Sequence, residues 1–132
     1  MSGHAFGVLV VEDDVDLASL MALVLSDAGY RVRTAPEGGA ALQRVAEEMP
    51  GLILLDMRMP GMNGWEFARQ FRARHGRAAP IVVVTAAENA RARAAEVEAE
   101  GWLAKPFEID EVLRMVAGHA AAAGQASAPA ET

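Results

Sequence analysis

Three short apolar segments, each followed directly by a polar residue, constrain the fold of this chain most strongly. The segments read FGVLVV, GLILL and PIVVV, and the residues that follow them are Glu12, Asp56 and Thr85. Uninterrupted apolar runs of this length are typical of strands that are buried on both faces of a parallel sheet. The sequence therefore predicts a central parallel sheet whose strands end in polar groups.

Apolar residues at helical spacing separate these segments. The first stripe ends before Gly29 and consists of Leu17, Leu20, Met21, Val24, Leu25 and Ala28. Further helices are expected at 37–48, 65–74 and 86–100 and from Ile109 onward, with short strands at 30–35 and 102–106. Five strands that alternate with five helices predict a doubly wound α/β fold with helices on both faces. We expect one domain at 1–117 and an Ala-rich frayed end or linker at 118–132.

Charge and composition exclude several classes of function. The 132 residues carry a formal net charge of -6, whereas nucleic-acid and anionic-membrane surfaces need clustered Lys and Arg. The chain has no Cys, which excludes disulfides and thiolate metal sites. No apolar run approaches the about 18 residues of a membrane span. We expect a cytoplasmic protein without direct contact to nucleic acid or membrane.

The polar strand ends are expected to meet. In an open α/β sheet the carboxyl ends of the strands share one edge, where ligands bind. Glu12, Asp13 and Asp56 would converge there, and Lys105 would add a positive charge. Clustered carboxylates repel unless a cation joins them, and an all-oxygen site of this kind suits Mg²⁺. Asp14 and Asp16, in contrast, are interpreted as capping acids at the start of a helix.

Four motifs in order, VLVVEDD, LLDMRMPGMNG, VVVTA and LAKPF, resemble the receiver domain of two-component response regulators. The resemblance covers roughly 6–117 and implies a flavodoxin-like fold with strand order 2-1-3-4-5. It implies that Asp56 is the phosphoacceptor and that Glu12 and Asp13 hold Mg²⁺. The backbone carbonyl of Arg58 would complete the protein ligands of the metal.

The same resemblance assigns the remaining roles. Lys105 would pair with the phosphoryl group, Thr85 would be the switch hydroxyl, and Trp102 occupies the position of a switch Tyr or Phe. The partners implied are a sensor histidine kinase or histidine phosphotransfer protein and an unknown downstream protein. Such a domain is not an enzyme for other substrates but catalyses its own phosphorylation and dephosphorylation. A phosphorelay shuttle or phosphate sink, and a module cut from a longer regulator or hybrid kinase, are alternatives.

Other classes fit the residues less well. A haloacid-dehalogenase-type phosphatase would need a second Asp where Arg58 stands, and a flavodoxin would need an uncharged loop after the first strand. A receiver used only for interaction would lack Asp56, Lys105 or Thr85. The segment before Trp102 is shorter than in the family, and within 86–100 Val97 is the only large apolar residue, which predicts a weakly docked fourth helix. The basic segment Arg69 to Arg77 is interpreted as a solvated face, with a docking site for an acidic partner as the alternative, and Trp65 is interpreted as packing.

Overall fold

The structure is a computed structural model that describes residues 5–127 and has the predicted alternation of strands and helices. The strands are β1 (Gly7–Val11), β2 (Arg31–Ala35), β3 (Leu52–Asp56), β4 (Ile81–Ala86) and β5 (Gly101–Lys105). The helices are α1 (Val15–Asp27), α2 (Gly38–Glu47), α3 (Gly64–His75), α4 (Ala90–Glu96) and α5 (Ile109–Ser127), with a 3-10 turn, η1 (Ala87–Asn89). The sheet is parallel in the order β2-β1-β3-β4-β5, which confirms the predicted doubly wound, flavodoxin-like topology.

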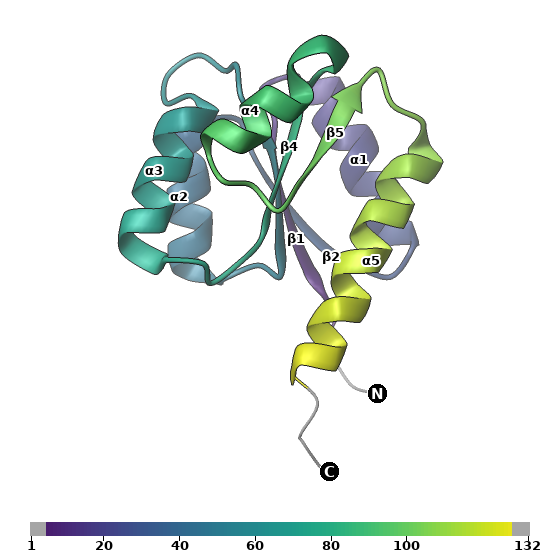
Figure 1. Ribbon diagram of the computed structural model, residues 1–132. Coiled ribbons are helices and arrows are strands. Elements are labelled where there is room, and N and C mark those ends of the chain that lie inside the picture. The colour runs from purple at the N-terminus through teal and green to yellow at the C-terminus, as the bar shows by residue number, and fades with distance from the viewer. Residues whose placement is uncertain (1–4, 128–132) are drawn as a thin grey trace.

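Helices cover both faces of the sheet (Figure 1). Helices α1 and α5 pack on one face over a core that includes Val8, Val10, Met21, Leu25, Val112 and Val116. Helices α2, α3 and α4 pack on the other face over a core that includes Leu9, Val11, Val45, Phe67, Phe71 and Val97. Successive strand residues enter opposite cores because side chains alternate along a strand. This explains why β3 is apolar and buried along its length up to Asp56.

Strand register brings the functional ends together. Val11 at the end of β1 lies opposite Leu55 of β3, so Glu12 and Asp56 leave the sheet side by side. Asp56 lies opposite Val84 of β4, next to Thr85. The order of the strands reverses between β1 and β3, and such a reversal opens a crevice at the carboxyl edge of an α/β sheet.

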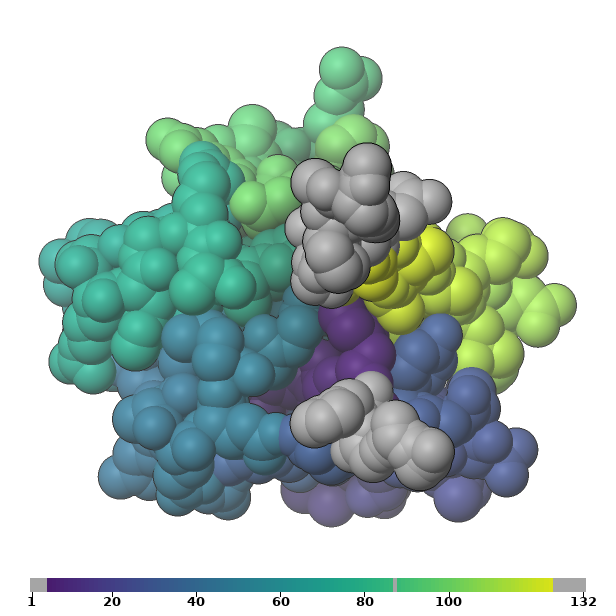
Figure 2. All heavy atoms as spheres, turned by 90° about the horizontal axis from the view of Figure 1, so that it is seen from below, coloured from purple at the N-terminus to yellow at the C-terminus, as the bar shows by residue number. Residues whose placement is uncertain are grey.

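Helix α5 continues past the predicted end of the domain. It reaches Ser127, so the expectation of a frayed segment from Gly118 is wrong for residues 118–127, while 128–132 lie outside the described residues. Four consecutive alanines from Ala120, the residue type with the highest helix propensity, explain the extension. The view from the amino ends of the strands shows the part of α5 drawn in yellow and the purple start of β1 on the same side of the molecule (Figure 2). Among residues 5–127, no helix is long and apolar enough to cross a bilayer.

Helix α4 is shorter than the predicted helix at 86–100, and polar contacts hold the loop that follows it. Ala90, Ala94 and Val97 are buried, which gives α4 only a small apolar contact. Arg72 of α3 donates from Nη2 to the carbonyl oxygen of Glu98 at 2.8 Å. Arg77 donates to side-chain oxygens of Glu98 at 2.6 Å and Glu100 at 2.8 Å. The interpretation of this basic segment as a solvated face is therefore wrong for Arg72, which is largely withdrawn from solvent, whereas Arg77 is exposed and contacts the loop after α4 at the surface.

The close contact between Gly64 and the end of β3 generates a stability prediction. A Cβ on Gly64 would lie 2.7 Å from the carbonyl oxygen of Asp56 and 2.7 Å from Cα of Met57. Because backbone cannot yield as a side chain can, Gly64→Ala should lower the free energy of unfolding by about 1–3 kcal/mol. Urea denaturation measures the change.

The matched control is Gly118→Ala within α5, where a Cβ meets nothing within 4 Å. That variant should be neutral or more stable by up to about 1 kcal/mol, because Ala favours helix over Gly. Equal stability of the Gly64→Ala variant and the wild type would contradict the proposed tight packing of α3 against the β3 end.

Candidate phosphoacceptor and metal site

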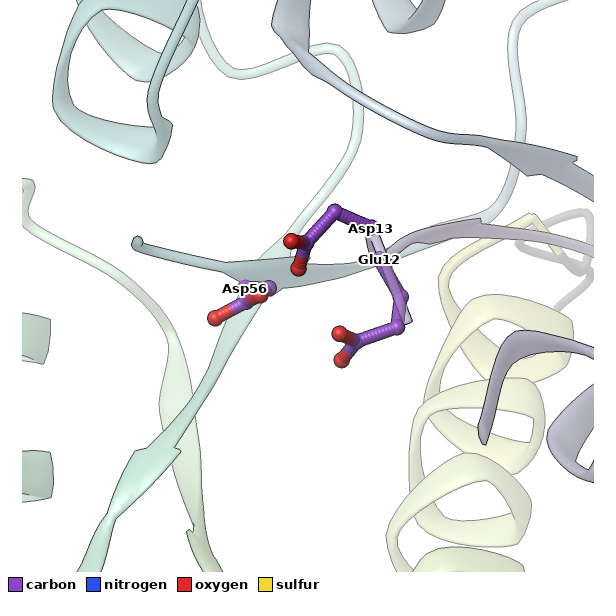
Figure 3. A group of neighbouring side chains, drawn as sticks. All are labelled: Glu12, Asp13 and Asp56. Carbon is purple, nitrogen blue, oxygen red and sulfur yellow. The ribbon is translucent and has the colours of Figure 1, made fainter. Parts of the chain in front are cut away.

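Three carboxylates converge at the carboxyl ends of β1 and β3 (Figure 3). One oxygen each from Glu12, Asp13 and Asp56 lies within 4.8 Å of the others. Glu12 is 4% and Asp56 6% exposed, whereas Asp13 is open to solvent. The predicted convergence of these side chains is thus present in the fold.

Lys105 at the end of β5 provides the positive charge of the site. Its Nζ donates to Oε1 of Glu12 at 3.1 Å and lies 4.0 Å from Oδ1 of Asp56. Parallel pairing of β4 with β5 places Lys105 opposite Ala86, directly after Thr85. The bond from Lys105 to Pro106 is cis. One ammonium group therefore contacts a cluster that contains three carboxylates.

Burial and like charge make the ionised form of Asp56 unfavourable. Loss of hydration is the largest cause, followed by the charge of Glu12, and together they raise the pKa of Asp56 to about 7. Lys105 and the backbone N–H of Arg58 act in the opposite direction. A carboxyl group with such a pKa lies poised between its acid and its nucleophilic form near neutral pH.

The neighbouring acids have structural roles. Oδ1 of Asp14 accepts a hydrogen bond from the backbone N–H of Leu17 at 3.1 Å, so Asp14 caps α1 as predicted. Its own backbone N–H donates to Oε2 of Glu12 at 3.1 Å and helps to fix that side chain. Asp16 lies in the first turn of α1, where its charge favours the helix.

An open cleft of about 390 Å³ surrounds the carboxylates. Its lining residues are Glu12, Asp13, Asp14, Asp56, Arg58, Thr85, Ala86, Asn89 and Lys105. Thr85, the last residue but one of β4, is 7% exposed, so its side chain is packed at the wall of the cleft. Asn89 was missed in the sequence, because the helix expected at 86–100 placed it inside a helix, whereas in the structure it directly precedes α4. Within the described part of the chain, its side chain makes no capping hydrogen bond to α4.

The two ends of Arg58 face different surroundings. Its backbone N–H donates to Oδ1 of Asp56 at 3.3 Å. Its guanidinium carbon lies 5.6 Å from the ring centroid of Trp65 at the start of α3. Trp65 in turn donates from Nε1 to Oε1 of Glu96 at 2.7 Å, a polar contact that the interpretation of Trp65 as packing did not include.

Trp102 lies apart from the cleft. It is 45% exposed on β5 and pairs in register with Val83, whereas Thr85 pairs with Ala104. Its side chain lines an open groove of about 460 Å³ with residues of α5 that include Met115. The structure thus holds Thr85 packed inward and Trp102 outward.

The geometry supports chemistry on an anionic ligand at a metal. Three carboxylates offer the hard oxygen ligands that Mg²⁺ prefers, and the open side of the cleft leaves room for a phosphoryl group and water. Asp56 also contacts Lys105, which can pair with an anion. The donor set therefore fits Mg²⁺ and a phosphate oxygen together.

Comparison with known proteins agrees with this geometry. The sequence model of the response regulator receiver domain matches residues 8–117. The DNA-binding response regulator MtrA of Mycobacterium tuberculosis is 37% identical over 111 residues, which are 83% of this chain and 48% of MtrA. The chain thus spans about half the length of the curated relatives that it matches.

Two solved structures share the fold. A putative response regulator from Chloroflexus aurantiacus has a TM-score of 0.81 and 34% identity, covering 89% of this chain and 99% of that one. The response regulator TrrA from Thermotoga maritima, in complex with Mg²⁺-BeF, has a TM-score of 0.77 and 30% identity. The match covers 86% of this chain and 98% of TrrA. With its parallel sheet, its acidic cleft and the family match over most of its length, the chain belongs to the response regulator receiver domains of two-component signalling systems.

Proposed function

We propose that this domain accepts a phosphoryl group on Asp56 from a cytoplasmic histidine kinase domain or a histidine phosphotransfer protein, in a reaction that requires Mg²⁺. The observation that carries the proposal is the convergence of Glu12, Asp13 and Asp56 within 4.8 Å, with Lys105 4.0 Å from Asp56. An ordinary cap or strand end has no need for three carboxylates and a lysine at one point.

The metal would be held by side-chain oxygens of Glu12, Asp13 and Asp56 and by the backbone carbonyl of Arg58. When bound, Mg²⁺ would neutralise charge on the carboxylates and on the phosphoryl oxygens. The packed position of Glu12, fixed by Lys105 and the Asp14 N–H, would keep one ligand in place before the metal binds. Asp13, which is exposed, would remain free to adjust.

In the transfer step a carboxylate oxygen of Asp56 attacks the phosphorus of a phosphohistidine. A P–O bond forms, the P–N bond breaks, and the electron pair of that bond returns to the imidazole nitrogen of the donor. The ammonium group of Lys105 would pair with a phosphoryl oxygen as the anionic phosphoryl group moves toward Asp56. In the self-catalysed dephosphorylation, a water oxygen would attack the phosphorus of the aspartyl phosphate, and a new P–O bond would form as the P–O bond to Asp56 breaks. The Asp56 carboxylate would leave, and inorganic phosphate and a proton would pass to solvent.

Movements of Thr85 and Trp102 would carry the conformational change from Asp56 to the surface of the domain. A phosphoryl group on Asp56 offers an acceptor to the Thr85 hydroxyl, which can reach it only by moving toward Asp56. That movement opens space at the β4–β5 edge for the outward Trp102 ring. The phosphate would then favour one of two states through contacts that exist in that state alone.

The output of the domain is a protein contact in this proposal. A net charge of -6 disfavours direct binding to nucleic acid, although the relative MtrA is a DNA-binding regulator. Because the chain spans about half of its curated relatives, a receiver module of a longer regulator is the second candidate. We keep 1–117 as the receiver and 118–132 as a tail or linker, with the α5 extension as its helical first part.

The metal assignment predicts a large loss of Mg²⁺ binding when Asp13 is neutralised. Asp13→Asn removes one ligand charge, so calorimetric titration should show Mg²⁺ affinity reduced by about tenfold or more. Asp16→Asn makes the same change of charge on α1 outside the cluster and serves as the matched control. Equal affinities of the Asp13→Asn and Asp16→Asn proteins would remove Asp13 from the site.

Phosphorylation itself is predicted to depend on Asp56. Incubation with acetyl phosphate and Mg²⁺ should add one phosphoryl group to the wild type, and intact-protein mass spectrometry measures it. Asp56→Asn should take no label, because an amide oxygen is a poor nucleophile. A label that persists on the Asp56→Asn protein would place the acceptor elsewhere.

The switch predicts where the surface responds. Hydrogen exchange with and without beryllofluoride, which stands in for the phosphoryl group, should change most in α4 and β5, because few apolar contacts hold α4. Thr85→Ala should remove that change while beryllofluoride still binds. Changes confined to the loop after Asp56, with 87–105 unaffected, would favour a phosphorelay shuttle or phosphate sink.

A further inference from the structure

A cluster of charged side chains surrounds Trp65 outside the acceptor cleft. Arg58 approaches the indole from the loop after β3, with its guanidinium carbon 5.6 Å from the ring centroid. Arg93 of α4 approaches the same ring at 5.8 Å. Glu96 accepts from Trp65 Nε1 at 2.7 Å and from Arg93 Nε at 2.8 Å. The ring therefore joins the acceptor loop, α3 and α4 through polar and cation–π contacts.

Electrostatics tie Arg58 to this cluster as well. Hydrogen bonds from Arg93 and Trp65 hold the pKa of Glu96 below its usual range, and the charge of Arg58 contributes in the same direction. The negative charge of Glu96 attracts Arg58, and the face of the indole favours a guanidinium. Both interactions act on an exposed, flexible side chain, which would otherwise respond to the strongest nearby negative charge.

That strongest charge is the acidic cluster itself. Arg58 lines the acceptor cleft, and its backbone N–H lies 3.3 Å from Oδ1 of Asp56. A long side chain that starts from this point can turn either to Trp65 or to the carboxylates. A guanidinium among the carboxylates would occupy the side of the cleft that a cation and a phosphoryl group need, and would repel the cation.

We propose that Trp65 is a positioning residue for the acceptor site: it holds the Arg58 guanidinium outside the cleft and so keeps the three carboxylates open to a divalent cation. The proposal rests on the proposed function, because it concerns the same metal site. Trp65 touches neither the carboxylates nor the metal in this account and acts through Arg58. Glu96 and Arg93 hold the indole in place from α4.

The test is a double-mutant cycle on Mg²⁺ affinity, measured by calorimetry. Trp65→Leu removes the aromatic face and the Nε1 donor, and should weaken Mg²⁺ binding by about threefold or more, the scale for moving one exposed charge a few Å nearer to a divalent ion. In an Arg58→Ala background the same Trp65→Leu change should have no effect. Trp65→Phe, which keeps a ring face, should restore most of the affinity.

Matched variants separate positioning from loss of structure. Arg69→Ala removes an arginine that lies on the same helix as Trp65 and is paired with Glu66. In the Arg69→Ala background, Trp65→Leu should still weaken Mg²⁺ binding. If Trp65→Leu does not fold, Glu96→Gln tests the same idea from the exposed side of the cluster. Glu96→Gln should also weaken Mg²⁺ binding, and this effect should be absent in the Arg58→Ala background.

The outcomes are distinct. A Trp65→Leu effect that persists undiminished in the Arg58→Ala background, or no effect of Trp65→Leu in a folded protein, would overturn the proposal alone. A wild type that binds no Mg²⁺ would overturn it together with the metal part of the proposed function. Phosphorylation of Asp56 is scored separately by mass spectrometry, so its failure with normal Mg²⁺ binding would affect only the transfer reaction.

Discussion

Repulsion among Glu12, Asp13 and Asp56 is the interaction on which the site depends. At the 4.8 Å limit that joins their oxygens, two unit charges repel by about 3 kcal/mol at an effective dielectric constant near 20. Lys105 offsets part of this repulsion, because its Nζ lies 3.1 Å from Oε1 of Glu12 and 4.0 Å from Oδ1 of Asp56. Burial of Asp56, followed by the repulsion from Glu12 that Lys105 leaves, raises the pKa of Asp56 to about 7. A divalent cation would relieve the same repulsion, which links metal binding to the nucleophilic form of Asp56.

The sheet imposes this repulsion on the carboxylates. Buried apolar strands fix the register of β1 against β3, and this register places Glu12 beside Asp56 with little freedom to separate. Gly64 adds to the constraint because α3 begins in contact with the backbone of Asp56 and Met57. The stability of the two apolar cores thus maintains a locally unfavourable arrangement of charge, as functional sites commonly require.

The sequence was informative where burial and chain direction determine position. Apolar runs and helical stripes are enough to predict the alternating sheet, and the residues that end the runs are enough to predict the acidic cluster. The strand order and the individual roles of Thr85 and Trp102 came from the motifs. Contacts between distant side chains were not predictable, as Trp65 shows: its partners Arg58 and Glu96 lie on other elements. The helical extension after Gly118 was misjudged because a lack of large apolar residues argued for a tail, whereas alanine favours helix.

The most direct test of the charge argument is a ¹³C NMR titration of the Asp56 carboxyl carbon. Without metal, in EDTA, the account predicts a pKa of about 7, because burial and Glu12 disfavour the carboxylate. With saturating Mg²⁺, the opposite charge should lower the pKa of Asp56, so the carboxyl stays ionised well below neutral pH. An ordinary carboxyl pKa of about 4 without metal, unchanged by Mg²⁺, would contradict the account.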